Sequence, residues 1–492
     1  MRYGRRQILK TAAVAAGAWA CGARGQEPRR PNVLLITSDQ QHWQAFGEAD
    51  TFFDTPNLDR LARSATVFRS AFCTTPQCSA SRSSIYTGFY PHKTTVIGNI
   101  NAIDHLGKPI KGLPTHFETL GTHLRKAAYH TGYFGKWHLG HHDHFAAHFD
   151  VADLDGDAQD GATRKALAYL QDRAAYPEQP FALCVNYINP HDIYHFKRMG
   201  KREQINPPSI PVPRPASWTE DFAGKPAPQR RFMTEDQGEY MLGKPDVFWE
   251  RYREFYREKC RLVDGQVGRV LDRLEALGLH DNTIVVYVSD HGDMDTNHRL
   301  IYKGPFMYEH LVRVPLMVRV PKAIGGVGPQ ELDEFALQTD ILPTLCDFAG
   351  ADPGLTDGFS LRGALTRARP MPSRDYVVSE YFNKQKWVNP IRMIRTRAFK
   401  YNRYLEHGEE LYDLENDPHE LVNLAHDPGF RKQKDELATQ LREWRAAQGD
   451  TAFDTYWPTN RDGTRYDPHA ASIPLARRRR PISHMRPTDT VT

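Results

Sequence analysis

The stretch Asn32-Val33-Leu34-Leu35-Ile36-Thr37-Ser38-Asp39 decides the fold class of this 492-residue chain. It is a continuous apolar run that ends in polar residues, which is the pattern of a strand buried on both faces of a parallel sheet. Strands that alternate with helices predict an α/β fold, with a mostly parallel sheet sandwiched between helices. The other strand patterns lie at residues 181–188, 282–289 and 314–320, and the helical patterns lie at 57–64, 117–127 and 248–277.

A change of pattern after about residue 352 predicts a smaller α+β subdomain. Short strand patterns follow at residues 376–381 and 391–396, and a helical pattern closes the region at 430–446. Between residues 195 and 244 the periodicity gives way to prolines and charges, which is typical of a functional loop or lid. We expect a signal peptide at residues 1–26, a catalytic domain at 31–351, a C-terminal subdomain at 352–456 and a basic tail at 457–492.

Composition excludes several classes of protein. Hydrophobic residues make up 40% of the chain and charged residues 25%, as in an ordinary globular protein. The net charge of +4 gives no general reason to expect nucleic acid as a partner. Six cysteines are too few for a disulfide scaffold. No apolar run reaches the roughly 18 residues that a transmembrane segment needs.

The N-terminus has the layout of a twin-arginine export signal. Arg5 and Arg6 precede a short, alanine-rich apolar stretch, and Ala18-Trp19-Ala20 offers a cleavage site. We therefore expect the twin-arginine (Tat) export machinery as a partner and a periplasmic or secreted location. Cys21, directly after the cleavage site, provides the alternative of lipoprotein anchoring.

The most informative segment for chemistry is Pro76-Gln77-Cys78-Ser79-Ala80-Ser81-Arg82-Ser83-Ser84-Ile85-Tyr86-Thr87-Gly88. Small hydroxyl residues after the cysteine favour a helix start, and Gly88 favours its end. The free N–H groups of a helix N-terminus suit an anionic ligand, and Arg82 lies one turn along on the same face as Cys78. Asp39 and Asp290 each follow a strand pattern, so both are expected at the same edge of the sheet.

These motifs resemble those of type I sulfatases, in the alkaline phosphatase superfamily. Cys78-x-Ala80-x-Arg82 with Thr87-Gly88 is similar to the family's C-x-P-x-R and L-T-G-R signature. The resemblance implies a large mixed, mostly parallel sheet of the alkaline phosphatase type. Further matches, in order along the chain, are Tyr90-Pro91-His92, Gly135-Lys136-Trp137-His138-Leu139-Gly140, Ser289-Asp290-His291-Gly292, Lys303-Gly304 and Glu410-Leu411-Tyr412-Asp413-Leu414.

The resemblance implies a modified nucleophile. A maturation enzyme would oxidise Cys78 to formylglycine, an aldehyde whose hydrate attacks sulfur and then expels sulfate by losing its second proton. The implied metal ligands contribute mostly oxygen atoms, so we favour Ca²⁺ over Mg²⁺ or Mn²⁺. Those ligands are Asp39, Gln40, Cys78, Asp290 and His291.

The remaining family positions imply roles around the sulfate group. Arg82 would orient the hydrate and neutralise charge, and Lys136 and Lys303 would clamp the sulfate oxygens. His138 and His191 fit a base for the hydrate and an acid for the leaving oxygen. No role is assigned to Asn99 or His298.

Two departures from the family pattern keep a second activity open. Ala80 replaces the usual proline, and Asp39-Gln40 replaces two aspartates. The Asp-Gln form also occurs in relatives that cleave phosphonate monoesters and phosphodiesters, whereas Lys136-x-His138 is typical of sulfatases. We expect a hydrolase of sulfate esters, with sulfated carbohydrates as its substrates. A binding protein without catalytic activity is the third reading, and it conflicts with the intact key positions.

Overall fold

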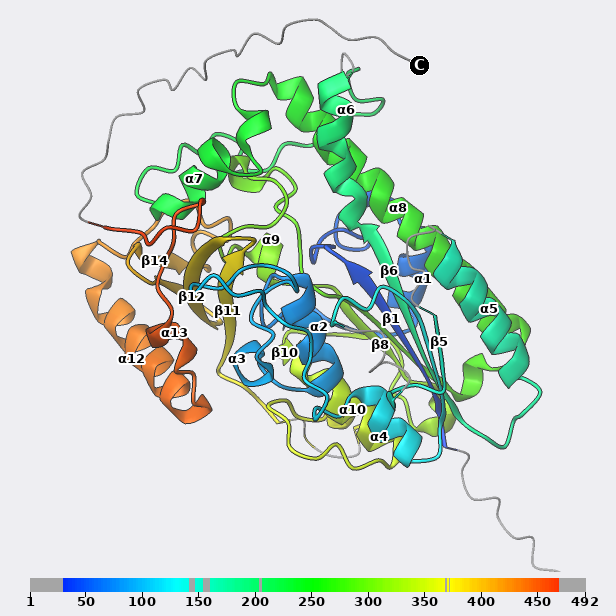
Figure 1. Ribbon diagram of the computed structural model, residues 1–492. Coiled ribbons are helices and arrows are strands. Elements are labelled where there is room, and N and C mark those ends of the chain that lie inside the picture. Colours follow the sequence, from blue (N-terminus) through cyan, green and yellow to red (C-terminus); the bar gives the residue numbers. More distant parts are fainter. Residues whose placement is uncertain are drawn as a thin grey trace, which may run out of the picture.

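The computed structural model describes residues 30–140, 147–153, 160–202, 206–367, 370 and 372–468. The expected signal peptide, Cys21 and the part of the tail beyond residue 468 lie outside these residues. Figure 1 shows a large sheet between two groups of helices, with a second, smaller sheet beside it. This arrangement confirms the predicted α/β fold with a C-terminal α+β part.

Within the described residues the main sheet has eight strands, in the order β5-β4-β6-β1-β7-β8-β2-β9. The strands from β5 to β7 run parallel, and β8 is antiparallel to both of its neighbours. The sheet is therefore mixed and mostly parallel. Its strands are β1 (Asn32–Asp39), β2 (Thr66–Phe68), β4 (His130–Gly135), β5 (Val151–Asp153), β6 (Phe181–Pro190), β7 (Thr283–Ser289), β8 (Leu316–Arg319) and β9 (Gln330–Leu332).

Strand β1 shows why a continuous apolar run belongs at the centre of this sheet. Val33 and Leu35 enter the hydrophobic core on one face, and Leu34 and Ile36 enter the core on the other. All four are at most 1% exposed. Full burial of an aliphatic side chain contributes about 1.5–3 kcal/mol, so both faces of β1 stabilise the fold.

Helices cover the two faces in separate groups (Figure 1). The long helix α8 packs on β6 and on its neighbours α1 and α5, while α10 packs on α2 and α4. The first group has the bounds α1 (Pro56–Ala62), α5 (Gly161–Arg173) and α8 (Asp246–Ala276). The second group has the bounds α2 (Cys78–Thr87), α4 (Leu120–Lys126) and α10 (Ile341–Ala349).

The C-terminal region is built on an antiparallel sheet in the order β11-β12-β13-β14. Helix α12 (Arg431–Gln448) contacts β12 and β13 and buries Leu437, Leu441 and Trp444, which recur at helical spacing on one face. Figure 1 shows this sheet and α12 on the left of the molecule. The strand bounds are β11 (Tyr376–Lys384), β12 (Trp387–Thr396), β13 (Phe399–Tyr404) and β14 (Gly408–Asp413).

The proline-rich segment is more ordered than its sequence pattern indicates. Helix α6 (Phe196–Arg202) and helix α7 (Ala227–Glu235) both form there. Pro226 immediately precedes α7, a position where proline is compatible with a helix start, and Phe232 and Met233 are buried. The short elements elsewhere are α3 (Pro91–Thr94), α9 (Glu309–Val312), α11 (Arg362–Thr366), α13 (Ala452–Thr455), β3 (Ala71–Phe72) and β10 (Ala336–Leu337).

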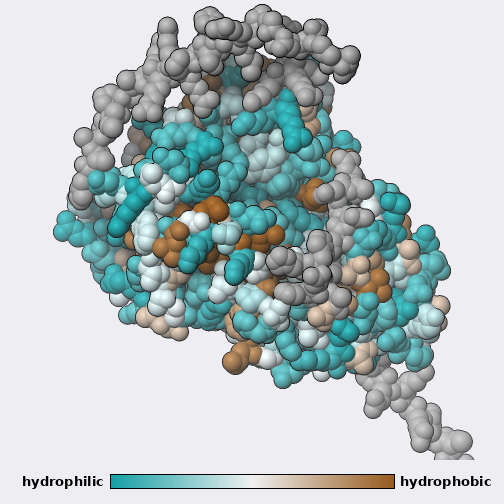
Figure 2. Space-filling view, viewed as in Figure 1, coloured by the Kyte–Doolittle hydropathy of each residue, from teal (hydrophilic) through white to brown (hydrophobic). Residues whose placement is uncertain are grey.

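The surface is mainly polar. Figure 2 shows that hydrophilic residues predominate on this face, with a smaller group of hydrophobic residues near its middle. In the part of the chain that the structure describes, no helix combines the length and apolarity that a bilayer crossing needs.

Candidate active site

The C-terminal ends of adjacent strands bring the acidic residues together. Strands β1 and β7 pair in register up to Ser38 opposite Ser289, so Asp39 and Asp290 leave the same edge. The Asp290 backbone N–H donates to the Ser38 carbonyl at 3.1 Å. Both aspartates are completely buried. The predicted meeting of these two carboxylates is confirmed by this geometry.

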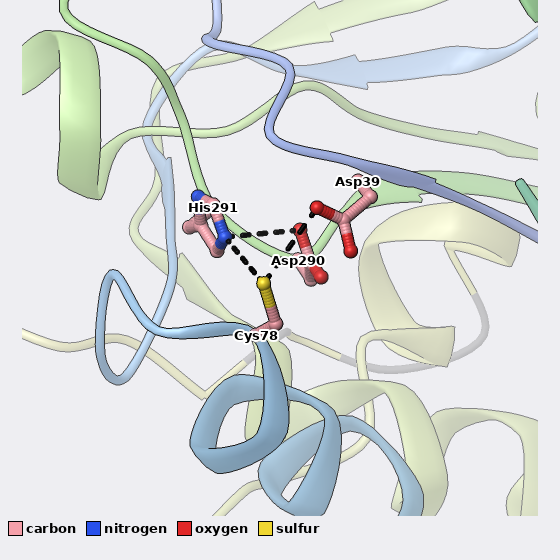
Figure 3. Close-up of side chains that lie close together, drawn as sticks. All are labelled: Asp39, Cys78, Asp290 and His291. Atoms are coloured by element: carbon pink, nitrogen blue, oxygen red, sulfur yellow. Dashed lines mark hydrogen bonds and ion pairs between the residues drawn. The ribbon is translucent and has the colours of Figure 1, made fainter. Parts of the chain in front are cut away.

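Cys78 is the first residue of α2 and points into the same cluster (Figure 3). Its Sγ lies 3.7 Å from an Asp39 oxygen and 3.3 Å from His291 Nε2. The Lys303 ammonium donates to this sulfur at 2.9 Å. Burial and the Asp39 charge raise the thiol pKa, but nearby cations, chiefly Lys136 and Lys303, hold it well below its usual value. The position therefore favours an anionic group on residue 78.

The cluster has the donor set of a cation site. The ligand atoms of Asp39, Cys78, Asp290 and His291 all lie within 4.8 Å of one another. His291 Nδ1 lies 2.8 Å from the Gly292 carbonyl oxygen, an acceptor, so Nδ1 carries the proton and Nε2 presents its lone pair to the cluster. Figure 3 shows the four side chains converging from three separate segments.

The Lys303 ammonium shows that these acceptors suit a positive charge. It donates to Gln40 Oε1 at 2.8 Å and to His291 Nε2 at 2.9 Å, in addition to Cys78 Sγ. Gln40, Cys78 and His291, three of the five predicted metal ligands, therefore all contact the Lys303 ammonium. The residues present therefore fit a divalent cation, and Gln40 offers an amide oxygen beside them.

Asp293 fixes the orientation of the Gln40 side chain, a role that sequence reasoning missed. Gln40 has a left-handed backbone (φ 72°), and its amide Nε2 donates to Asp293 Oδ2 at 2.7 Å. The other amide atom, Oε1, consequently faces the cluster. Asp293 also accepts hydrogen bonds from Tyr252 Oη at 3.1 Å and from the Asp295 N–H at 2.8 Å. The signal in the sequence that Asp293 belongs to this site was its position two residues after His291.

Arg82 neutralises the two carboxylates from the opposite side. It is completely buried, and its Nε donates to Asp290 Oδ2 at 3.0 Å while Nη2 donates to Asp39 Oδ2 at 3.2 Å. Burial lowers the pKa of the Arg82 guanidinium, but the charges of the two carboxylates raise it by more, so the net shift is upward. Burial also raises the pKa of Asp39, yet Lys136 and the other nearby cations hold it well below the usual value. For Asp290, burial and the Asp39 charge raise the pKa.

Lys136 and the two predicted histidines complete the group. The Lys136 ammonium forms an ion pair with Asp39, and its side chain is 12% exposed. Burial and the Lys136 charge lower the pKa of His191 to about 3. Burial also lowers the pKa of His138, whose Nδ1 has no hydrogen-bond partner among the described residues. Both lowered pKa values favour the neutral imidazole at pH 7.

Beside this cluster lies a cavity of about 320 Å³. It reaches Lys303 and His191, so a molecule inside it would be next to residue 78. Asn99 is part of its wall, and its Oδ1 also accepts the Ser79 N–H at 3.1 Å. The lining residues are Gln77, Asn99, Ile100, Asn101, Ala102, His191, Tyr194, Gln237, Lys303, Lys384 and Gln385.

His298 lies apart from the cluster. Its Nδ1 is 3.1 Å from a Glu220 oxygen, and its ring stacks on Tyr308 with centroids 3.8 Å apart. These contacts describe a packed, hydrogen-bonded side chain in the loop before Lys303.

Comparison with known proteins identifies the family. The family model described as Sulfatase matches residues 31–351, and a second model, N-sulphoglucosamine sulphohydrolase, C-terminal, matches residues 297–447. The chain belongs to the sulfatase family. The prediction of a sulfatase enzyme from the sequence motifs is confirmed.

This sulfatase is similar to several characterised relatives. It is 32% identical to a Delta 4,5-hexuronate-2-O-sulfatase of Bacteroides thetaiotaomicron, over 84% of this chain and 88% of the relative. It is 28% identical to an arylsulfatase of Clostridium perfringens, over 83% of this chain and 93% of the relative. A solved structure of a 2-O GAG sulfatase superposes with a TM-score of 0.77 at 27% identity, covering 89% of this chain and 98% of that one.

Proposed function

We propose that this sulfatase hydrolyses sulfate esters of carbohydrates through residue 78, after oxidation of Cys78 to formylglycine. The observation that carries the proposal is the placement of the Cys78 sulfur between Lys303, His291 and Asp39. An unmodified thiol would become trapped after attack, because its sulfated product has no second hydroxyl through which to expel sulfate. A hydrated aldehyde has that hydroxyl.

Asp39, Gln40, Asp290, His291 and residue 78 would hold the cation, which we propose to be Ca²⁺, with Mg²⁺ or Mn²⁺ as alternatives. When bound, the cation supplies positive charge that favours the anionic form of the nucleophile. Asp293 supports the site because it holds the Gln40 amide with Oε1 toward the cluster.

The other side chains would handle charge and protons. Lys303 donates to the Cys78 sulfur, and Lys136 pairs with Asp39 in the same cluster. Both lysines would bind the sulfate oxygens, where negative charge grows in the transition state. Arg82 would favour the ionised forms of Asp39 and Asp290, because it donates a hydrogen bond to each carboxylate. His138, whose lowered pKa favours the neutral imidazole, would take the proton of the hydrate. His191 would protonate the leaving oxygen, because a bound sulfate ester adds the negative charge that favours its cationic form.

The substrate class rests on the relatives and on the cavity. The relatives include enzymes named Delta 4,5-hexuronate-2-O-sulfatase and N-acetylglucosamine-6-O-sulfatase. The cavity wall is rich in side-chain amides, which bind hydroxyl groups well. We therefore propose a sulfated glycosaminoglycan-type sugar.

A phosphonate monoester or phosphodiester is the second candidate substrate, and Gln40 is the residue that favours it. A phosphonate monoester hydrolase of Agrobacterium radiobacter shares the fold, with a TM-score of 0.66 at 22% identity. Lys136-x-His138 favours the sulfate ester instead. Turnover of an aryl sulfate beside an aryl phosphodiester, measured on one preparation, separates the two.

The domain and export expectations remain proposals: a catalytic domain at 31–351, a subdomain at 352–456 and Tat export of the folded chain. A fusion of residues 1–30 to a folded reporter should reach the periplasm. Equal export after replacement of Arg5 and Arg6 by lysine would refute this route.

The nucleophile itself provides the main test. Protein produced with a formylglycine-generating enzyme should show the aldehyde mass in the peptide that contains residue 78, and that peptide should react with a hydrazide probe. Cys78→Ala should lose turnover by several orders of magnitude. Cys73→Ala is the matched control, because Cys73 is also a fully buried thiol but lies outside the cluster. Full sulfatase activity with an unmodified Cys78 thiol would refute the mechanism.

A further inference from the structure

The cavity beside residue 78 contains one lysine, Lys384, that the proposed hydrolysis does not use. Its wall contains two lysines, Lys303 and Lys384, and none of its lining residues is acidic. Lys303 faces the nucleophile, as described above. Lys384 is the last residue of β11, so the C-terminal sheet delivers it to the cavity from a distant part of the chain.

Lys384 is an unusual cation because it is buried without an acidic partner. It is 9% exposed, and no carboxylate among the described residues forms an ion pair with it. Its ammonium donates to the Lys303 backbone carbonyl and lies 4.6 Å from the centre of the Phe232 ring. A buried ammonium without an anion is costly, and a bound anion would remove that cost.

Burial and the surrounding charges determine the protonation state of Lys384. Burial, together with smaller contributions from Lys303 and Arg461, lowers the pKa of Lys384 to about 7 against the raising effect of Asp236 and Asp293. Asp236 itself pairs with Arg461 at 3.1 Å. The ammonium is therefore partly deprotonated at neutral pH, and an anion in the cavity would favour its charged form.

Two amide atoms in the same wall also lack a hydrogen-bond partner among the residues that the structure describes. Gln77 is 1% exposed, yet its Nε2 has no hydrogen-bond partner among the described residues, and the same is true of Gln237 Oε1. Asn101 and Gln385 add two further amides to the lining. Buried polar atoms are normally paired, so these atoms indicate a polar ligand that supplies donors and acceptors.

We propose that this cavity binds a sugar ring that carries a second anionic group in addition to the scissile sulfate, and that Lys384 binds this second anion. The proposal rests on the proposed function, since the scissile sulfate must lie at residue 78. Because the Lys384 ammonium contacts the Lys303 backbone and the Lys303 ammonium contacts residue 78, the two charges are separated by about one lysine side chain. The amide groups between them would bind the ring hydroxyls. The second anion is a uronate carboxylate or another sulfate.

Two substrate pairs distinguish these sources. The first pair is a hexuronate 2-O-sulfate and its carboxyl methyl ester; the second is glucosamine 2-N,6-O-disulfate and glucosamine 6-O-sulfate. For at least one pair, the wild-type enzyme should prefer the more anionic member by about tenfold or more in kcat/KM, the effect of one charge-assisted hydrogen bond. The pair that shows the preference identifies the anion.

The variants test the residue. Lys384→Met should abolish the preference within that pair, and Lys384→Gln, which keeps a donor for the Lys303 carbonyl, should abolish it too. Lys386→Met is the matched control, because Lys386 is an exposed lysine in the same hairpin and does not line the cavity. A purely structural role for Lys384 would lower turnover of both members equally and leave the preference intact. That result would overturn the proposal.

Binding separates this proposal from the proposed function. In Cys78→Ala, dissociation constants for both pairs are measured by calorimetry without turnover. Preference for the more anionic sugar, lost when Lys384→Met is added, supports the anion site even if residue 78 proves unmodified. Equal affinity within both pairs overturns the anion site, whereas formylglycine at residue 78 without any sulfate ester turnover overturns only the proposed function.

Discussion

Replacing Arg82 by methionine would remove a cation that two buried carboxylates share. Its guanidinium bonds Asp39 at 3.2 Å and Asp290 at 3.0 Å, and all three side chains have no exposed surface. Loss of one partner from a buried ion pair costs about 3–5 kcal/mol, because a buried charge is left uncompensated. With an unfolding entropy of about 2.1 cal/mol/K per residue, a loss of 4 kcal/mol lowers the Tm of a 492-residue chain by about 4 °C.

The cation should reverse much of this loss. Without Arg82 the two carboxylates attract a divalent cation more strongly, so saturating Ca²⁺ should raise the Tm of Arg82→Met more than that of the wild type. Arg392→Met is the matched control: Arg392 is equally buried and bonds Asp450 at 2.7 Å and 2.8 Å, far from the cluster in the C-terminal sheet. It should lose similar stability and gain nothing extra from Ca²⁺.

Thermal melting in EDTA and in Ca²⁺ measures both effects. Arg82→Lys serves as a second variant if the methionine variant folds poorly, since it keeps the charge and loses the fork of donors. Equal Ca²⁺-induced shifts in the wild type and in the Arg82 and Arg392 variants would refute the electrostatic link between Arg82 and the cation site.

Three further outcomes are expected. Asp290→Ala should abolish turnover and lower the Ca²⁺ content measured by plasma emission spectroscopy; unchanged content would remove Asp290 from the ligand set. His191→Ala should lower kcat by about 10²–10⁴-fold on sugar sulfates but much less on 4-nitrophenyl sulfate, whose leaving group needs no proton; an equal loss on both would contradict a general acid. Because the lysine pKa of about 7 means that Lys384 is charged below pH 7, KM for an anionic sugar sulfate should rise as the pH increases through 7. A pH profile of KM that is identical in Lys384→Met would contradict this reasoning.

The strands that could be predicted from the sequence are those buried on both faces, because such strands appear as continuous apolar runs. Strands β1 and β7 form within one residue of their apolar runs, since both lie at the centre of the sheet. Strand β4 escaped detection because only Tyr133 and Phe134 in His130–Gly135 are bulky and apolar, and the other four residues are two glycines, a threonine and a histidine. The antiparallel direction of β8 was also unpredictable, because a buried apolar run has the same composition in either direction.

Some residues of the candidate site could likewise be predicted from the sequence and others could not. Asp39, Cys78 and Asp290 were identifiable because each stands in a local motif at the end of a strand or the start of a helix. Asp293 and Lys384 were not, because their importance comes from contacts with residues distant in sequence. Lys384 in particular becomes buried only when the C-terminal sheet packs beside the loop that carries Lys303.

The complete burial of Cys78 sets an order of events in the biosynthesis of this protein. The thiol stands at the start of α2 and has no exposed surface, so the active site of another protein has no access to it. The proposed oxidation therefore has to precede the docking of α2, while the segment is still extended. Chain that folds before the proposed oxidation would keep an unmodified thiol at position 78, so the active fraction of a preparation would depend on the rate of oxidation relative to the rate of folding.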